Sequence, residues 1–226
     1  MAILTPRVLR ALERFNAAYP WDHNAHYHPW ILRQLPRRFG RGLDVGCGSG
    51  ELVRLLARRA GVVRGVDRDA GIVARARELT PVGAGVEFVV GEALEVLEGR
   101  EGHEGDDGAY DVVTCVATLH HLPLGDALRQ LRAQLAPGGT LVVVGLARAE
   151  TRGDHLLGAL AVPLNVALGW LKNKGRPAPR PVAMTAPTRP AETGFAEVVR
   201  EARRVLPGAR LRRRVFWRYT LVWRRV

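Results

Sequence analysis

The sequence LDVGCGSG, residues 43–50, joins a short apolar run to an amphipathic stretch, and the rest of the chain is best interpreted outward from it. Residues 42–45 are typical of a buried strand, and Leu52, Leu55 and Leu56 mark one face of a following helix. Glycines at such a turn let the backbone bend tightly and approach a ligand, whose polar end meets free amide groups at the helix start. The segment predicts a ligand site at the carboxyl end of this strand.

The same alternation of apolar runs and helical stretches continues to Leu146. Further runs at residues 62–66, 86–90, 110–116 and 140–146 are typical of buried strands. Two intervening stretches carry apolar residues at helical spacing: Ile72, Val73, Ala76 and Leu79 behind the capping residue Asp69, and Leu124, Leu128, Leu131 and Leu135 before Pro137-Gly138-Gly139. This order predicts an α/β fold, a doubly wound parallel sheet with helices on both faces.

Both ends of the chain depart from this rhythm. A capped amphipathic helix is predicted from Thr5, and an antiparallel hairpin from the runs 209–215 and 218–224. We therefore divide a single domain, 1–226, into four parts: an N-terminal helical lid (1–40), a core (41–146), an apolar and proline-rich cap (147–190), and a closing helix with its hairpin (191–226).

Composition excludes several classes of protein. The 226 residues are 47% hydrophobic and 25% charged, as in an ordinary globular domain, and two cysteines make no disulfide scaffold. The N-terminal arginines argue against a signal peptide, and no run of 18 uncharged apolar residues predicts a spanning helix, so we expect a cytoplasmic protein. The net charge of +12 raises the question of nucleic acid, but it is carried almost wholly by arginine, which fits a GC-rich genome equally well.

The glycine spacing narrows the ligand. The turn has the pattern G-x-G-x-G instead of the G-x-G-x-x-G of dinucleotide sites, and no phosphate-binding G-x-x-x-x-G-K-[ST] occurs. Asp67 ends the next strand about 20 residues on, where a carboxylate can accept hydrogen bonds from both ribose hydroxyls. A nucleoside without a pyrophosphate fits best.

At this point the chain resembles a known family. LDVGCGSG, GVDRD, GEALEV, YDVVTCVATLHHL and LAPGGTLVVVG resemble, in order and spacing, the successive motifs of class I S-adenosylmethionine-dependent methyltransferases. The resemblance covers residues 41–145 and extends to the closing hairpin. It implies a Rossmann-like, seven-stranded, mostly parallel sheet with an antiparallel C-terminal hairpin, S-adenosylmethionine as cofactor and S-adenosylhomocysteine as product.

The resemblance also implies roles for individual residues. Asp67 would hold the ribose, Glu92 the adenine amine, and the glycine loop the methionine and ribose portion. The full set of implied cofactor contacts is Asp44, Gly46, Cys47, Gly48, Gly50, Asp67, Arg68, Glu92, Ala93 and Val116, with Tyr27 from the lid. For Asp44, Asp67 and Glu92 a purely structural role, as a turn or cap carboxylate, is the alternative.

Methyl transfer from a sulfonium is an in-line displacement, so alignment and exclusion of water can supply much of the rate. A general base is needed only where the acceptor must lose a proton. His120 and His121 follow the fourth strand at its carboxyl edge and are our candidate catalytic residues. A structural or cofactor-lining role for either histidine is the alternative.

Two further segments are candidates for contact with the acceptor. In residues 19–30, Tyr19, His26 and Tyr27 could fold over the cofactor; the histidine spacing there matches no zinc pattern, and we expect no metal. Residues 156–171 could form an apolar cap over the acceptor, an ordinary helix pair broken at Pro163, or a segment lying on a membrane surface.

The sequence therefore predicts an enzyme that transfers a methyl group to an O, N or C atom of a small, apolar or aromatic metabolite. The alternatives are an RNA methyltransferase using the hairpin arginines, and a cofactor-binding protein without catalysis. We do not expect a nucleic-acid partner, because alternating arginines also protect an edge strand from aggregation. Monomer and homodimer remain equally open.

Overall fold

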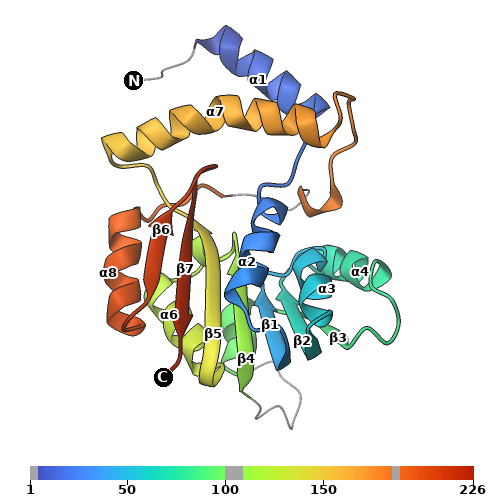
Figure 1. Cartoon of the computed structure of the whole chain (residues 1–226), viewed down its shortest axis with the longest axis vertical. Coiled ribbons are helices and arrows are strands. Elements are labelled where there is room, and N and C mark those ends of the chain that lie inside the picture. Colours follow the sequence, from blue (N-terminus) through green and yellow to red (C-terminus); the bar gives the residue numbers. More distant parts are fainter. Residues whose placement is uncertain (1–4, 100–108, 185–188) are drawn as a thin grey trace.

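The computed structural model describes residues 5–99, 109–184 and 189–226 and centres on a seven-stranded sheet in the order β3-β2-β1-β4-β5-β7-β6 (Figure 1). The strands are β1 (Phe39–Val45), β2 (Ala60–Asp67), β3 (Val86–Val90), β4 (Tyr110–Val116), β5 (Leu135–Leu146), β6 (Arg210–Arg213) and β7 (Arg218–Arg224). Strands β1 to β5 pair in parallel, and β7 runs antiparallel to both β5 and β6. The predicted fold class is confirmed.

Helices cover both faces of this sheet, because its central strands are apolar on both sides. The helices are α1 (Pro6–Ala18), α2 (His28–Gln34), α3 (Glu51–Ala57), α4 (Ala70–Glu78), α5 (Ala93–Leu97), α6 (Leu124–Ala133), α7 (Arg152–Lys172) and α8 (Phe195–Val205). Helices α5, α6 and α8 bury one face of the sheet, and α2, α3 and α4 bury the other. Asp69 caps α4 as predicted, accepting from the amides of Gly71 and Ile72.

One predicted helix end is wrong. Helix α6 ends at Ala133, and Leu135, expected on its apolar face, is instead the first residue of β5. Pro137-Gly138-Gly139 lies inside β5, where the pairing with β4 shifts register between Tyr110 and Val112. The shift accommodates a bulge in which Gly138 has φ +78°, so these residues interrupt a strand and do not end a helix.

The closing hairpin is shorter than expected on its first strand. Strand β6 ends at Arg213, and the chain turns through Phe216 and Trp217, which both have positive φ. Two consecutive positive φ values are the geometry of a tight hairpin turn that matches the twist of its strands. Two of the hairpin arginines contact other parts of the protein. Arg213 forms an ion pair with Asp154, and the Arg214 guanidinium lies over the Trp30 ring.

The apolar segment of the predicted cap forms one helix, which removes the alternative of a helix pair broken at Pro163. Helix α7 runs for 21 residues through Pro163, and a capping box of Thr151 and Asp154 starts it. It is long and apolar enough to cross a membrane by length and composition alone. Helices α7 and α1 lie beyond the carboxyl edge of the parallel strands, apart from the sheet (Figure 1).

Candidate functional site

The carboxyl ends of β1, β2 and β4 open into a cleft of about 640 Å³. The strand order reverses between β1 and β4, and open α/β sheets bind their ligands at such a switch point. Nine of the predicted site residues line this cleft: Gly46, Gly48, Asp67, Arg68, Glu92, Ala93, Val116, His120 and His121. The predicted cofactor residues and the candidate catalytic histidines therefore line the same cavity.

The glycines of the turn serve different purposes. Gly46 has φ +76°, and a Cβ placed on it would lie 1.8 Å from Oγ1 of Thr118, so only glycine fits there. Gly48 has φ +51°, and a Cβ on it would meet no atom within 4 Å, because it faces the open cleft. At Gly50, a Cβ would lie 2.6 Å from the Phe88 ring. Gly50 is therefore required for packing, and it does not line the cleft among the described residues.

Asp67 holds the turn in place. One carboxylate oxygen, Oδ2, accepts from the amide of Gly48 at 2.8 Å, and Oδ1 accepts from the amide of Asp69 at 3.1 Å. Each carboxylate oxygen has a second lone pair, so the group can accept two more hydrogen bonds from a ligand. Asp67 therefore has the structural role that the sequence left open, and it also lines the cleft.

Asp44 lies beneath the surface of the cleft and is not one of the described residues that line it. Its side chain is buried between β1 and β4, and Oδ1 accepts from the Thr114 hydroxyl at 2.6 Å. Burial, more than the neighbouring charge of Asp67, raises the pKa of Asp44 to about 7. Asp44 is not among the described residues that line the cleft, and it supports the turn from below.

Cys47 and Tyr27 also turn away from the cleft. The Cys47 thiol packs against β2, where a Cβ on Gly65 would lie 3.0 Å from Sγ, and burial raises its pKa. Tyr27 donates its hydroxyl to the Val215 carbonyl at 2.7 Å, and burial raises its pKa to about 12. Both side chains are used in packing, which sequence spacing alone could not distinguish from ligand contact.

The adenine side predicted by resemblance carries an exposed ion pair. Arg68 and Glu92 approach to 3.9 Å across the cleft rim, both about half exposed. Ala93 and Ile72 form apolar wall beside them. On the opposite wall, Ala117 has φ +52° directly after β4, a strained conformation of a kind that is concentrated at functional sites.

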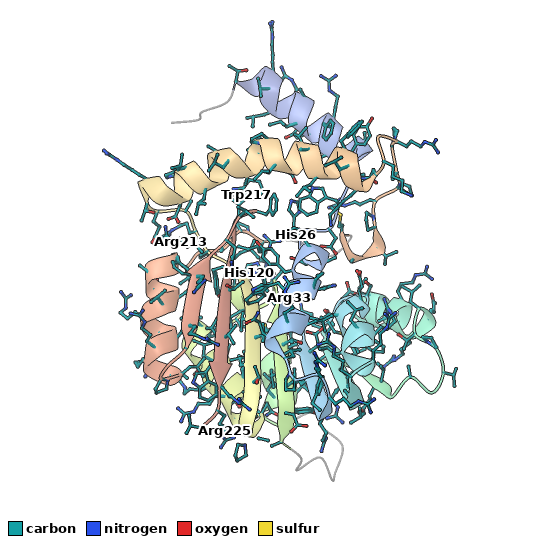
Figure 2. All side chains as sticks on the ribbon, in the orientation of Figure 1. His26, Arg33, His120, Arg213, Trp217 and Arg225 are labelled. Atoms are coloured by element: carbon teal, nitrogen blue, oxygen red, sulfur yellow. The ribbon has the colours of Figure 1, made fainter. Side chains whose placement is uncertain are left out.

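His120 lies at the cleft edge that faces α7, as Figure 2 shows. Its Nε2 lies 3.2 Å from the carbonyl oxygen of Arg189, which can only accept, so Nε2 carries the proton. Nδ1 therefore presents a lone pair, and this buried atom has no partner among the residues that the structure describes. Burial, the neighbouring His121 and the charge of Arg218 lower the pKa of His120 to about 4.

Arg218 supplies a donor to the same cleft. Its guanidinium donates to Oδ1 of Asn24 at 2.9 Å and to the Phe216 carbonyl at 3.2 Å. Its Nε is buried and has no partner within the described part of the chain. The His121 ring stacks at 3.9 Å from the His120 ring, and burial, with help from Arg68 and Arg189, lowers its pKa.

Much of the wall on this side comes from segments that the sequence suggested as lid and cap, but through residues that were not singled out as ligand contacts. It comes from the lid segment (residues 19–30), the start of β7 and the chain after α7, and the unexpected residues include Asp22, His23, Asn24, Arg180, Ala183, Met184, Arg189 and Arg218. The structure describes residues 147–184 and 189–190 of the predicted cap. Among these, every residue that lines the cleft comes after α7. No local pattern marks such residues, since each acquires its role from a distant segment.

Asn165 is a central link between the lid segment and α7; Asn173, directly after the helix, adds a hydrogen bond from its Nδ2 to the Pro20 carbonyl at 2.9 Å. Oδ1 of Asn165 accepts from Nε1 of Trp21 at 2.9 Å and lies 2.8 Å from Nε2 of His23. The amide nitrogen of Asn165 donates to Oδ1 of Asn16 in α1 at 2.9 Å. The predicted contacts of Tyr19 and His26 with a ligand have no counterpart in the described lining, and His26 stacks edge-on against Trp21 instead. The described part of the chain holds no group of three or more His, Cys, Asp or Glu side chains that could bind a metal ion.

Comparisons with known proteins agree with this geometry. A family model described as a methyltransferase domain matches residues 43–139. An uncharacterized methyltransferase of Mycobacterium tuberculosis is 30% identical over 209 residues, which cover 91% of this chain and 97% of that protein. The ubiquinone biosynthesis O-methyltransferase of Ralstonia nicotianae is 34% identical over 145 residues, which cover 57% of each protein.

A solved structure shares the fold. The N-methyltransferase NodS from Bradyrhizobium japonicum, solved in complex with S-adenosyl-L-homocysteine, superposes with a TM-score of 0.57 at 18% identity, covering 96% of this chain and 97% of that one. The chain belongs to the class I S-adenosylmethionine-dependent methyltransferases, since motif order, strand order, family match and the mycobacterial relative all agree.

Proposed function

We propose that this methyltransferase acts on a hydroxyl group of a small, apolar or aromatic acceptor. The observation that carries the proposal is that His120, whose Nδ1 has no partner among the described residues, and the cationic Arg218 both line one cleft. A hydroxyl group can donate to the free lone pair of His120 and can accept from a guanidinium, so the chemistry of this wall suits it. The O-methyltransferase name of the Ralstonia relative supports the same chemistry.

The charges on this side of the cleft favour a hydroxyl over an amine. Arg180, Arg189 and Arg218 all contribute to the wall, and their positive charge disfavours a protonated amine there. The same charge stabilises the negative charge that develops on an acceptor oxygen as its proton leaves. Burial lowers the pKa of His120 to about 4, so its imidazole is neutral at pH 7 but a weak base, and it takes the acceptor's proton only as the forming bond between oxygen and methyl makes that proton acidic.

The cofactor end of the cleft fits S-adenosylmethionine. We propose that the free lone pairs of Asp67 accept from the ribose hydroxyls, that Glu92 and Arg68 border the adenine with Ala93, and that the backbone at Gly46 and Gly48 and the side chain of Val116 line the methionine portion. The bound cofactor supplies a methyl group on a positively charged sulfur, which needs no further activation. Asp44, Cys47, Gly50 and Tyr27 then act by shaping the walls, and His121 by packing on His120.

Two variants test this division of roles. His120→Gln removes the basic nitrogen and should lower kcat with a phenolic acceptor by about 10²-fold, with cofactor affinity nearly unchanged. Asp67→Asn should do the reverse, weakening cofactor binding by about tenfold or more, since a hydrogen bond to a charged group contributes about 1.5–3 kcal/mol. Steady-state kinetics measures the effect on kcat, and calorimetry measures the effect on cofactor affinity. Full turnover of His120→Gln on a phenol would rule out the proposed role of this histidine.

A further inference from the structure

One face of α7 is apolar and uncovered over most of its length. Leu156, Leu160, Leu164, Trp170 and Leu171 are between 44% and 63% exposed, and no charged residue occurs from 156 to 171. Leu156, Leu160 and Leu164 follow one another at four-residue intervals, so they lie on one stripe of the helix. We call these five residues the α7 stripe. A monomeric protein rarely leaves so continuous an apolar strip in water without using it.

The opposite face of α7 is packed against the rest of the protein. Ala161, Asn165 and Gly169 are buried, and Asn165 holds the lid segment and α1 by the hydrogen bonds described above. A Cβ on Gly169 would lie 2.8 Å from the Tyr19 carbonyl oxygen, so the contact with the lid segment is close. Spanning a membrane would break these contacts, whereas lying along a surface keeps them. The helix therefore suits an interface and not a transmembrane position.

Positive charge is concentrated in α7 and in the segments next to it. Residues 5–19 and 152–184, which hold α1, α7 and the chain after it, contain eight basic and two acidic residues. Their net charge of +6 is half of the chain's +12 in about a fifth of its length. Lys174 and Arg176 are exposed immediately past the stripe, and Arg7, Arg10 and Arg14 are exposed on α1. A basic rim around an apolar stripe complements an anionic surface with an apolar interior.

The helix that carries the α7 stripe also leads into the wall of the cleft. Helix α7 runs across the carboxyl edge of the sheet, and Figure 2 shows His120 between that edge and the helix. The chain that leaves α7 contributes Arg180, Ala183 and Met184 to the cleft wall. One element thus connects the outer apolar face with the acceptor side of the cleft.

We propose that the α7 stripe is the face by which this protein lies on an anionic lipid bilayer and takes an amphipathic acceptor from it. The stripe inserts between lipid headgroups, and the basic rim binds their phosphates. This inference rests on the proposed function for the nature of the acceptor. A second copy of the chain is a poorer occupant, because it would bring two surfaces of net charge +6 together.

Vesicle sedimentation of the full chain tests the proposal without cofactor or acceptor. Wild-type protein should sediment with mixed phosphatidylcholine–phosphatidylglycerol vesicles far more than with pure phosphatidylcholine, and less at high salt. Leu160→Glu with Leu164→Glu should reduce the partition by roughly tenfold or more. The matched control is Val82→Glu, at a fully exposed position in the loop before β3. It should bind as wild type does.

The charged rim is tested independently by Lys174→Glu with Arg176→Glu, which leaves every apolar side chain in place. This pair should also lose binding to anionic vesicles by roughly tenfold. Turnover of a water-soluble phenol should stay at the wild-type level in both double variants, so failure here is distinct from failure of the His120 assignment. Equal sedimentation of wild type and variants, or no vesicle binding at all, would overturn the proposal. A dimer in sedimentation equilibrium that the stripe variant dissociates would assign the stripe to self-association instead.

Discussion

The two sides of the cleft are built in opposite ways. The cofactor side comes from consecutive strand-to-helix turns, and its anchor, the hydrogen bond from Gly48 to Asp67, joins residues 19 positions apart. The acceptor side is assembled from segments at opposite ends of the chain, such as Asn24 and Arg218, which are 194 positions apart. A site made of neighbouring turns can serve many relatives with one cofactor, while the distant segments are free to vary with the acceptor.

The largest expected effect tests the rigidity of the cofactor side. Gly46→Ala places a methyl group 1.8 Å from Thr118 Oγ1 at a positive φ, so we expect a loss of about 2–4 kcal/mol in the free energy of unfolding. Gly48→Ala is the matched control, because its methyl group meets no neighbour. It should cost only about 1 kcal/mol in stability but weaken cofactor binding. Denaturant unfolding and calorimetry measure both, and equal unfolding free energies for the two variants would contradict the distinction.

A smaller effect concerns Asp44 beneath the turn. Because its folded pKa of about 7 exceeds the ordinary 3.8, the folded protein binds an extra proton between these values, and stability falls as pH rises through this window. Asp44→Asn keeps the oxygen that Thr114 binds and removes the charge. It should match the wild type near pH 4 and be more stable by about 1–3 kcal/mol at pH 8. Parallel pH profiles for the two proteins would show that Asp44 does not titrate in this range.

The next prediction tests how the acceptor side is held. Asn165→Leu leaves the indole of Trp21 without its partner, and burying such a group costs about 1–3 kcal/mol. We expect a higher KM for the acceptor with little change in cofactor affinity, since the partners of Asn165 lie in the lid segment and in α1 and none belongs to the glycine turn. Asn16→Ala is the control, because it removes the contact with α1 alone and should leave the KM for the acceptor near wild type. A change in cofactor affinity equal to the change in acceptor KM would mean that the two sides are not independent.

The smallest expected effect lies at the boundary between the two sides. Ala117→Gly removes the strain of φ +52° and should raise the free energy of unfolding by about 0.5–1 kcal/mol. Turnover should fall slightly, because the wall beside Val116 gains freedom. Thermal unfolding and kcat measured on the same preparation check both signs. A destabilised glycine variant would show that the Ala117 methyl group is worth more in packing than its backbone strain costs.

The strands and the cofactor side were predictable because their signals are local. Strands β3 and β4 have the predicted bounds, and Gly46, Gly48 and Asp67 lie on the cleft as expected. Errors arose where one local pattern served two structures. Leu135 continues the apolar spacing of α6 yet begins β5, and Pro163 predicts a break that the long helix α7 tolerates.

The residues Cys47, Gly50 and Tyr27 show what a motif leaves undecided. Cys47 and Gly50 belong to the glycine turn and Tyr27 to the lid segment. In the structure the Cys47 thiol packs against Gly65, Gly50 leaves room for the Phe88 ring, and the Tyr27 hydroxyl donates to the Val215 carbonyl. Direction is set by the neighbouring elements and not by the motif letters. Arg218 is the converse case, a cleft residue that looked like one basic residue among many in the C-terminal hairpin.

Local spacing was enough to establish the order of strands and helices, the glycine turn and the acidic residue after β2. The spacing of apolar residues and the positions of glycines involve residues only a few positions apart, so they can be recognised in the amino-acid sequence. The contact of Arg218 with Asn24, the tether at Asn165 and the uncovered face of α7 became apparent only in three dimensions. They depend on contacts between segments more than a hundred residues apart, and on which side of a helix those contacts leave bare.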